Sequence, residues 1–161
     1  MPKRTTTNLI VVHCSATVEG NDIGFAEIDE MHKNRGFLHR ETGIHCGYHE
    51  IIRLDGTIEL GRPLDQIGAH AKGFNSRSIG ICLVGGIAAD GEAEDTFTSM
   101  QRESLLYTLL HKRRVYKDAT ILGHRDLSPD LNNDGVITPD EYMKECPCFS
   151  VKEFIEHHGF N

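Results

Sequence analysis

Residues 8–13 read Asn-Leu-Ile-Val-Val-His, and this stretch does most to decide the fold. It is apolar, rich in β-branched residues and too short for a helix, so it predicts a buried strand. His13 stands at the end of that strand. A polar side chain in this position lies at the edge of a sheet on a rigid support, where a functional site can be held accurately.

Further strands and helices follow outward from this first strand. An Asp-Gly pair at residues 55–56 separates two β-rich runs and predicts a hairpin. Thr98 with Gln101, and Ser150 with Glu153, form capping-box patterns ahead of apolar residues at helical spacing. The expected strands are 48–53, 57–60, 78–84 and 120–123, and the expected helices are 26–35 and the stretches after Thr98 and Ser150. This alternation predicts an α/β fold, a single domain with a mixed central β-sheet flanked by helices.

The composition limits the class of protein. The 161 residues carry a formal charge of −7, so a nucleic-acid partner is not expected. No apolar run approaches the roughly 20 residues that cross a bilayer, and the N-terminus lacks the apolar stretch of a secretory signal. We therefore expect one domain over residues 1–161, a monomer without a membrane partner that is cytoplasmic as synthesised. Five cysteines, an odd number, favour reduced thiols over a disulfide framework.

Two histidines and one cysteine stand out by position. Five other histidines have ordinary explanations, as surface residues or as partners of a helix dipole: His32, His39, His111, His157 and His158. His13 ends one predicted strand and His124 directly follows another, and with Cys146 they would leave a tetrahedral zinc one open position for water. On spacing alone, core histidines and a small buried thiol are the better explanation of the same residues.

Four separated segments carry a family resemblance. They are VVHCSAT (11–17), GYHEIIRLDGTIELGR (47–62), GAHAKGFNSRSIGICLVGG (68–86) and KECPCF (144–149). In this order they resemble the type 2 N-acetylmuramoyl-L-alanine amidases, in particular the amidase-type lysozymes of bacteriophages, with peptidoglycan recognition proteins as more distant relatives. The fold that this family implies, a mixed β-sheet flanked by helices, agrees with the pattern described above.

The resemblance implies a zinc site. His13 in VHCSAT, His124 in GHRD and Cys146 in KECP match the zinc ligands of the family. Cys146 precedes a proline, as the ligand cysteine of the family does. Cys148 falls where the resemblance expects a small residue, so we expect it to be a buried structural thiol.

The resemblance also implies catalytic and substrate-binding residues. Tyr48 in GYH and Lys144 in KEC match the catalytic pair of the phage lysozymes. The segment that lines the substrate groove of the family corresponds here to His70, Lys72 and Asn75. Without the resemblance, a core tyrosine, a solvated lysine and a flexible polar loop would explain these residues.

One position departs from the family and leaves the general base open. Some members carry a glutamate in the strand that corresponds to residues 78–84, whereas this chain has Cys82 there. Glu50, two residues after Tyr48, is a candidate substitute. An ordinary hairpin charge is the alternative explanation of Glu50.

The implied reaction is hydrolysis of the amide bond between N-acetylmuramic acid and L-alanine in peptidoglycan, with zinc as the cofactor. Peptidoglycan or a muropeptide is the expected partner. A module that binds muropeptides without cutting them, or a zinc peptidase that cuts within the stem peptide, is the alternative. The protein would act on the cell wall after release, or on wall fragments in the cytoplasm.

An insert between His124 and Cys146 resembles a calcium loop. Residues 126–142 make this chain longer than the compact phage lysozymes, and they contain the full EF-hand pattern D-x-[DN]-x-[DN]-G-x5-E. The predicted calcium ligands are the side chains of Asp130, Asn132, Asp134 and Glu141 with the backbone carbonyl of Val136. Calcium would order the insert and so fix Cys146 and Lys144 relative to His124. A surface turn rich in Asn, Asp and Gly is the alternative.

Overall fold

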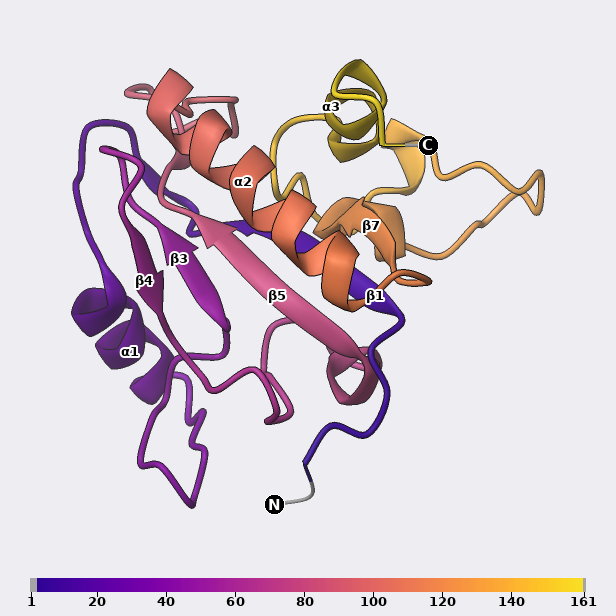
Figure 1. Ribbon diagram of the computed structural model, residues 1–161. Helices are drawn as coiled ribbons and strands as arrows, with labels where there is room; N and C mark the ends of the chain where they lie inside the picture. The colour runs from indigo at the N-terminus through magenta and orange to yellow at the C-terminus, as the bar shows by residue number, and fades with distance from the viewer. Residues whose placement is uncertain (1–2, 161) are drawn as a thin grey trace.

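The computed structural model describes residues 3–160, and a five-stranded mixed β-sheet forms its centre. The strand order is β4-β3-β5-β1-β7 (Figure 1). The strands are β1 (Leu9–Cys14), β3 (Glu50–Ile52), β4 (Ile58–Leu60), β5 (Ser78–Leu83) and β7 (Thr120–Gly123). β5 and β7 run parallel to β1 on its two sides, β3 runs parallel to β5, and β4 is antiparallel to β3. The predicted hairpin and the mixed sheet are confirmed.

Helices cover both faces of this sheet. α2 (Ser99–Val115) crosses one face in front of β5, and α3 (Val151–His157) packs beside β7 (Figure 1). The core beneath α2 includes Ile10, Val12, Ile52, Ile79, Ile81, Leu83, Leu105 and Leu109. α1 (Phe25–Lys33) covers the opposite face, where Ile28 packs with Ile51 and Cys82. Alternate residues of β3 and β5 therefore serve different cores, and the predicted α/β architecture is confirmed.

α2 begins and packs as its sequence predicts. The Thr98 hydroxyl accepts a hydrogen bond from the N–H of Gln101 (3.1 Å), and Oε1 of Gln101 accepts one from the N–H of Thr98 (3.1 Å). This reciprocal pair is a capping box. Leu105 and Leu109 are completely buried against the sheet, whereas Leu110 is 47% exposed. The apolar stripe that faces the sheet therefore includes Leu105 and Leu109 but not Leu110, although Leu110 also stands at helical spacing.

Glu50 lies on the face of β3 that packs against α2, and its carboxylate pairs there with Lys112 of α2. It is registered with Ile81 of β5, whereas His13 is registered with Cys82, the next residue of β5. Because neighbouring residues of a strand point to opposite faces, Glu50 points away from His13. The hypothesis that Glu50 replaces the missing general base is wrong.

Two histidines expected at the surface are buried. Nδ1 of His32 on α1 accepts a hydrogen bond from the N–H of Gly47 (2.8 Å), and His39 lies within hydrogen-bond distance of Gln66 (3.1 Å). Their polar sequence neighbours gave no sign of this, because the packing of α1 against residues 45–48 buries His32. His111, on α2, is exposed as predicted.

Short elements shape the loops around the sheet. β2 (Thr17–Val18) pairs in parallel with β6 (Gly86–Ile87). Three short 3₁₀ helices lie between the longer elements: η1 (Asn75–Arg77), η2 (His124–Leu127) and η3 (Pro139–Glu141). Within residues 3–160, no helix combines the length and the apolar character that a membrane crossing requires.

Candidate metal centre

Three side chains that can bind a metal meet at the carboxyl ends of β1 and β7. His13 is the penultimate residue of β1, His124 directly follows β7, and Cys146 lies in the loop that leads to α3. One donor atom from each lies within 4.8 Å of the other two donor atoms. Within the described chain, residues 3–160, no other group of this kind is found. These three residues are the ones that the family resemblance implies as zinc ligands.

Backbone contacts hold the three donors in place. The N–H of Arg125 donates to the carbonyl of Cys146 (2.8 Å), and the N–H of Cys14 donates to Sγ of Cys146 (3.2 Å). A Cβ at Gly123 would come 2.8 Å from Cδ of Pro147, so the glycine lets the cysteine loop pack directly on the end of β7. The cysteine segment is therefore fixed to both strands that carry the histidines.

A buried chain of hydrogen bonds sets the proton positions on His13. The hydroxyl of Ser78 donates to the carbonyl of Phe74 (2.9 Å), so the same oxygen accepts from Nε2 of His70 (3.3 Å). Nδ1 of His70 then carries no proton and accepts from Nε2 of His13 (2.9 Å). This leaves the lone pair on Nδ1 of His13 available for a metal, and that atom lies 3.8 Å from Sγ of Cys146. A hydrogen bond on the second ring nitrogen is the usual support of a metal-bound histidine.

Burial keeps the imidazoles of the centre neutral. It lowers the pKa of His13 well below its ordinary value, and burial together with the charge of Lys144 lowers the pKa of His124 to about 4. Neutral imidazole is the form that binds a metal. The neighbouring Cys14 thiol and burial raise the pKa of the Cys146 thiol. A cation held by the two imidazoles would favour the thiolate form of Cys146.

Tyr48 and Lys144, the predicted catalytic pair, lie beside these donors. The ring centroid of Tyr48 is 5.2 Å from that of His13 and 5.1 Å from that of His32. Burial raises the pKa of Tyr48, so its phenol keeps the proton. Lys144 is exposed, and its charge is one of the causes that lower the pKa values of His13 and His124. The centre therefore has a phenol and an ammonium group close to the three metal-binding side chains.

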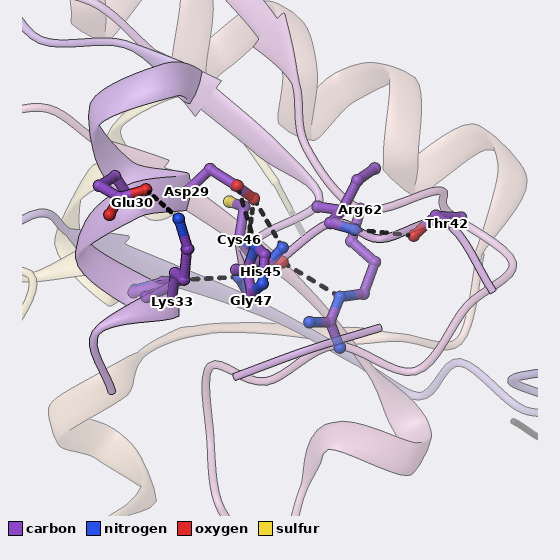
Figure 2. Close-up of polar contacts among 10 residues, drawn as sticks. Asp29, Glu30, Lys33, Thr42, His45, Cys46, Gly47 and Arg62 are labelled. Carbon is purple, nitrogen blue, oxygen red and sulfur yellow. Dashed lines mark hydrogen bonds and ion pairs between the residues drawn. The ribbon is translucent and has the colours of Figure 1, made fainter. Parts of the chain in front are cut away.

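The segment ahead of Tyr48 is clamped to α1. Oδ1 of Asp29 accepts hydrogen bonds from the N–H groups of His45 (2.6 Å) and Cys46 (2.7 Å), as Figure 2 shows. Nε of Arg62 donates to the carbonyl of Cys46 (3.1 Å; Figure 2). Because these contacts fix the backbone directly before Tyr48, α1 takes part in positioning that side chain.

His124 and Cys146 line a groove of about 710 Å³. His70, Lys72 and Asn75, the predicted substrate-binding residues, also line it. Lys72 is exposed, but His70 is 9% exposed and engaged with His13. Oδ1 of Asn75 accepts from the N–H of His70 and from that of the following residue, both at 2.9 Å. The exposed Lys72 side chain can thus contact a ligand in the groove. His70 instead holds His13, and Asn75 holds the backbone at His70.

α1 and the loop after it supply a wall of the groove that the sequence did not indicate. His32, Arg35 and Phe37 line the groove there. They belong to no motif, and the packing of α1 beside the sheet is what places them at the site. Together with Lys72 and Lys144, Arg35 makes the lining cationic. No Asp or Glu within residues 3–160 lines this groove.

The insert with the calcium pattern is ordered by its own backbone. The carboxylate of Asp130 accepts from two backbone N–H groups (2.6 and 2.8 Å) and that of Glu141 from three (2.7, 3.2 and 2.9 Å), all within the loop. Asp134 accepts from the amide of Asn132 and from the N–H of Val136. Within the described residues, the group of clustered His, Cys, Asp and Glu side chains lies at His13, His124 and Cys146 and not in this loop. Calcium binding has no support here and stays a prediction from the sequence.

Comparison with known proteins gives the family. The model of the family described as N-acetylmuramoyl-L-alanine amidase matches residues 3–148. The chain belongs to this amidase family. The matched region includes the three donors of the metal centre as well as Tyr48 and Lys144. The family predicted from the four sequence segments is confirmed.

Individual relatives of this amidase family agree with the assignment. An endolysin of Klebsiella phage KP32 is 42% identical over 154 residues, which cover 96% of this chain and 89% of the relative. The solved structure of the endolysin amidase LysCS from Clostridium intestinale URNW matches with a TM-score of 0.70 at 30% identity, over 98% of this chain and 88% of that one. The X-ray structure of Apis mellifera PGRP-SA shares the fold, with a TM-score of 0.67 at 17% identity over 97% and 86% of the two chains.

Proposed function

We propose that this chain is a zinc-dependent amidase that hydrolyses the bond between N-acetylmuramic acid and the first L-alanine of the stem peptide in peptidoglycan. One observation carries the proposal. In a chain of the N-acetylmuramoyl-L-alanine amidase family, His13, His124 and Cys146 converge beside a groove large enough for a ligand.

The donor set fits zinc. Imidazole nitrogen and thiolate sulfur bind zinc at about 2.0 and 2.3 Å, so two such ligands of a tetrahedral ion lie about 3.6 Å apart. Nδ1 of His13 and Sγ of Cys146 are 3.8 Å apart. Two imidazoles and one thiolate leave a fourth position open, and zinc in such a site supplies Lewis acidity and an activated water for attack on a carbonyl.

In this proposal Lys144 and Tyr48 act on the scissile amide. Nζ of Lys144 donates to the carbonyl oxygen as negative charge develops on it. The hydroxyl of Tyr48, whose pKa burial raises, hydrogen-bonds the attacking water or an oxygen of the tetrahedral intermediate. Glu50 faces α2, and no Asp or Glu within residues 3–160 lines the groove, so the proposal assigns the general base to no carboxylate.

Two further roles follow from the surroundings of the centre. His70 is a positioning residue that holds the Nε2 proton of His13 and so aims Nδ1 at the metal. Lys72 and Arg35 give the groove positive charge, which suits the carboxylates of a stem peptide. The substrate class that the proposal names, an acidic muropeptide, is thus consistent with the lining.

Digestion of purified peptidoglycan by the zinc-loaded protein tests the proposed function, with mass analysis of the soluble products. The amidase releases stem peptides of full length with a free L-alanine N-terminus. Shortened peptides would establish a peptidase instead. A folded, zinc-loaded protein that binds muropeptides and releases no product would establish a binding module. Cys146→Ser is the inactive reference, and Cys148→Ser, two residues away, is the matched control expected to keep its activity.

A further inference from the structure

Two thiols outside the metal-binding set face each other next to the centre. Cys14 is the last residue of β1, and Cys148 follows the ligand candidate Cys146 by two positions. The Sγ atoms of Cys14 and Cys148 are 3.9 Å apart, although the two residues are separated by 134 positions in the sequence. Cys14 is 5% exposed and lines the groove, and Cys148 is half-buried. The two sulfur atoms are therefore in van der Waals contact, and must approach each other to form a bond of about 2.05 Å; Cys148 is the more exposed of the two.

A glycine on the neighbouring strand leaves room for both sulfur atoms. A Cβ at Gly86 would lie 2.8 Å from Sγ of Cys14 and 3.5 Å from Sγ of Cys148. Gly86 has a φ of +99°, in the region that favours glycine. The thiol of Cys148 donates to the carbonyl of Gly86 (3.4 Å). The space at Gly86 lets the two sulfur atoms turn toward each other without displacing a side chain at that position.

The remaining cysteines are engaged elsewhere. The thiols of Cys46 and Cys82 donate to the backbone carbonyls of Tyr48 and Leu83, both at 3.7 Å. Sγ of Cys146 also contacts Cys14, whose N–H donates to it (3.2 Å), and it lies 3.8 Å from Nδ1 of His13, so a bound metal would hold this sulfur. Cys14 and Cys148 are thus the two thiols that can pair while the metal centre stays intact.

We propose that Cys14 and Cys148 form a disulfide bond when the metal-loaded protein meets a small-molecule disulfide such as oxidised glutathione. Cys148, the more exposed thiol of the pair, attacks the reagent, which gives a mixed disulfide and releases one glutathione thiol. Cys14 then attacks the sulfur of Cys148, which forms the Cys14–Cys148 bond and releases the second glutathione thiol. Two electrons pass from the protein thiols to the reagent, and the two thiol protons end on the two glutathione molecules.

The cross-link would join the segments that carry two of the metal donors. β1 supplies His13, and the loop at Cys146 continues directly to Cys148. A bond between residues 134 positions apart restricts the unfolded chain strongly, so the thermal midpoint of the oxidised protein should rise by about 5 °C or more. We also expect a chelator to remove the metal several-fold more slowly from the oxidised form. We expect both thiols to stay reduced at the redox potential of the cytosolic glutathione pool, and to form the disulfide in a more oxidising compartment.

The test oxidises zinc-loaded protein with oxidised glutathione, quenches it in acid, alkylates the free thiols and maps the peptides by mass spectrometry. The expected result is one linkage between Cys14 and Cys148, with three alkylated cysteines per chain. Five alkylated cysteines, a stable glutathione adduct, or a linkage that includes Cys146 would overturn the proposal. No substrate is used, so the result is independent of whether the chain is an amidase.

Cys148→Ser is the decisive variant, since serine keeps a donor for the carbonyl of Gly86. It should bind zinc like the wild type and lose the oxidation-dependent rise of the thermal midpoint. Cys46→Ser, which removes a buried thiol outside the pair, should keep that rise relative to its own reduced form. An equal rise in Cys148→Ser would contradict the proposed bond.

Discussion

The metal centre draws its donors from three distant parts of the chain, whereas the insert at residues 126–142 carries its candidate donors within one short loop. At the centre, His13 and His124 lie at the ends of neighbouring parallel strands, so strand pairing brings them together. In the insert, the carboxylates of Asp130 and Glu141 accept hydrogen bonds from the backbone of the loop itself. The dispersed set converges on one point, and the local motif uses its oxygen atoms to shape a turn.

The difference teaches that strand pairing can bring distant donors together, whereas in a local motif the same oxygen atoms also serve the backbone of their own loop. A strand end is held by a ladder of hydrogen bonds and by the core beneath it, so its side chain keeps one direction. A surface loop must satisfy its own backbone N–H groups, and short Asp and Asn side chains do this readily. The following four predictions test the contrast between the centre and the insert.

The largest effect is expected at Lys144. Lys144→Ala should lower kcat by about 10²–10³-fold, because it removes a donor to the developing oxyanion. Zinc content should not change, since Lys144 is exposed and is not one of the three metal-binding side chains. Release of stem peptides measured under saturating substrate gives kcat, and Lys152→Ala, an exposed lysine on α3, is the control. Wild-type turnover in Lys144→Ala would remove this residue from the mechanism.

His70→Ala should weaken zinc binding by about 10–100-fold, because the hydrogen bond that orients His13 is lost. Competition with a chromophoric chelator measures the affinity. Nitrogen NMR of His13 should show the Nε2-protonated tautomer in the wild type and a mixture of tautomers in the variant. His70→Asn, which can still accept at that position, should restore part of the affinity. An unchanged His13 spectrum in His70→Ala would reduce His70 to a packing role.

Acidification should destabilise the metal-free protein through its buried histidines. Burial lowers the pKa of His49 to about 4, and an unfolded histidine titrates near 6.5. Between these values the unfolded chain binds a proton that the folded chain does not, so stability falls as pH drops from 6.5 toward 4. The expected slope is about 1.4 kcal/mol per pH unit for each such histidine. Urea unfolding of metal-free protein measures it, and His49→Gln should show a smaller slope; identical slopes would contradict this account.

The smallest effect is expected in the insert. Glu141→Gln replaces an acceptor oxygen by a donor, so the thermal midpoint measured without calcium should fall by a few degrees. Asp140→Asn, at the exposed neighbouring position, is the control. A wild-type midpoint that rises with calcium, and a Glu141→Gln midpoint that does not, would show that the sequence pattern had predicted a real calcium site.

The sequence predicted those parts of the molecule that depend on local pattern. The apolar run ending at His13 and the capping box at Thr98 each determine a local element, and the structure contains both. The face on which Glu50 lies depends on its register with β5, and no local signal reveals that register. The same holds for the buried His32 and for Asp29, whose clamp on residues 45 and 46 requires α1 to pack beside them.

The metal-binding residues could be predicted from the sequence only in part. Spacing alone did not distinguish His13, His124 and Cys146 from core residues, and the ordered family segments did. The sequence could not show which contacts hold His13 in place, namely the hydrogen-bond chain through His70 and Ser78. That chain exists because β5, which carries Ser78, pairs beside β1, and the loop ahead of β5 brings His70 next to His13.

Zinc affinity in matched cysteine variants tests the central claim most directly. Under reducing conditions, native mass spectrometry and chelator competition should give one zinc per chain for the wild type and for Cys148→Ser. Cys146→Ser should lose at least about 100-fold in affinity, since a thiolate ligand is replaced by a neutral hydroxyl. Wild-type affinity in Cys146→Ser, or loss of zinc in Cys148→Ser alone, would contradict the assignment of the centre to His13, His124 and Cys146.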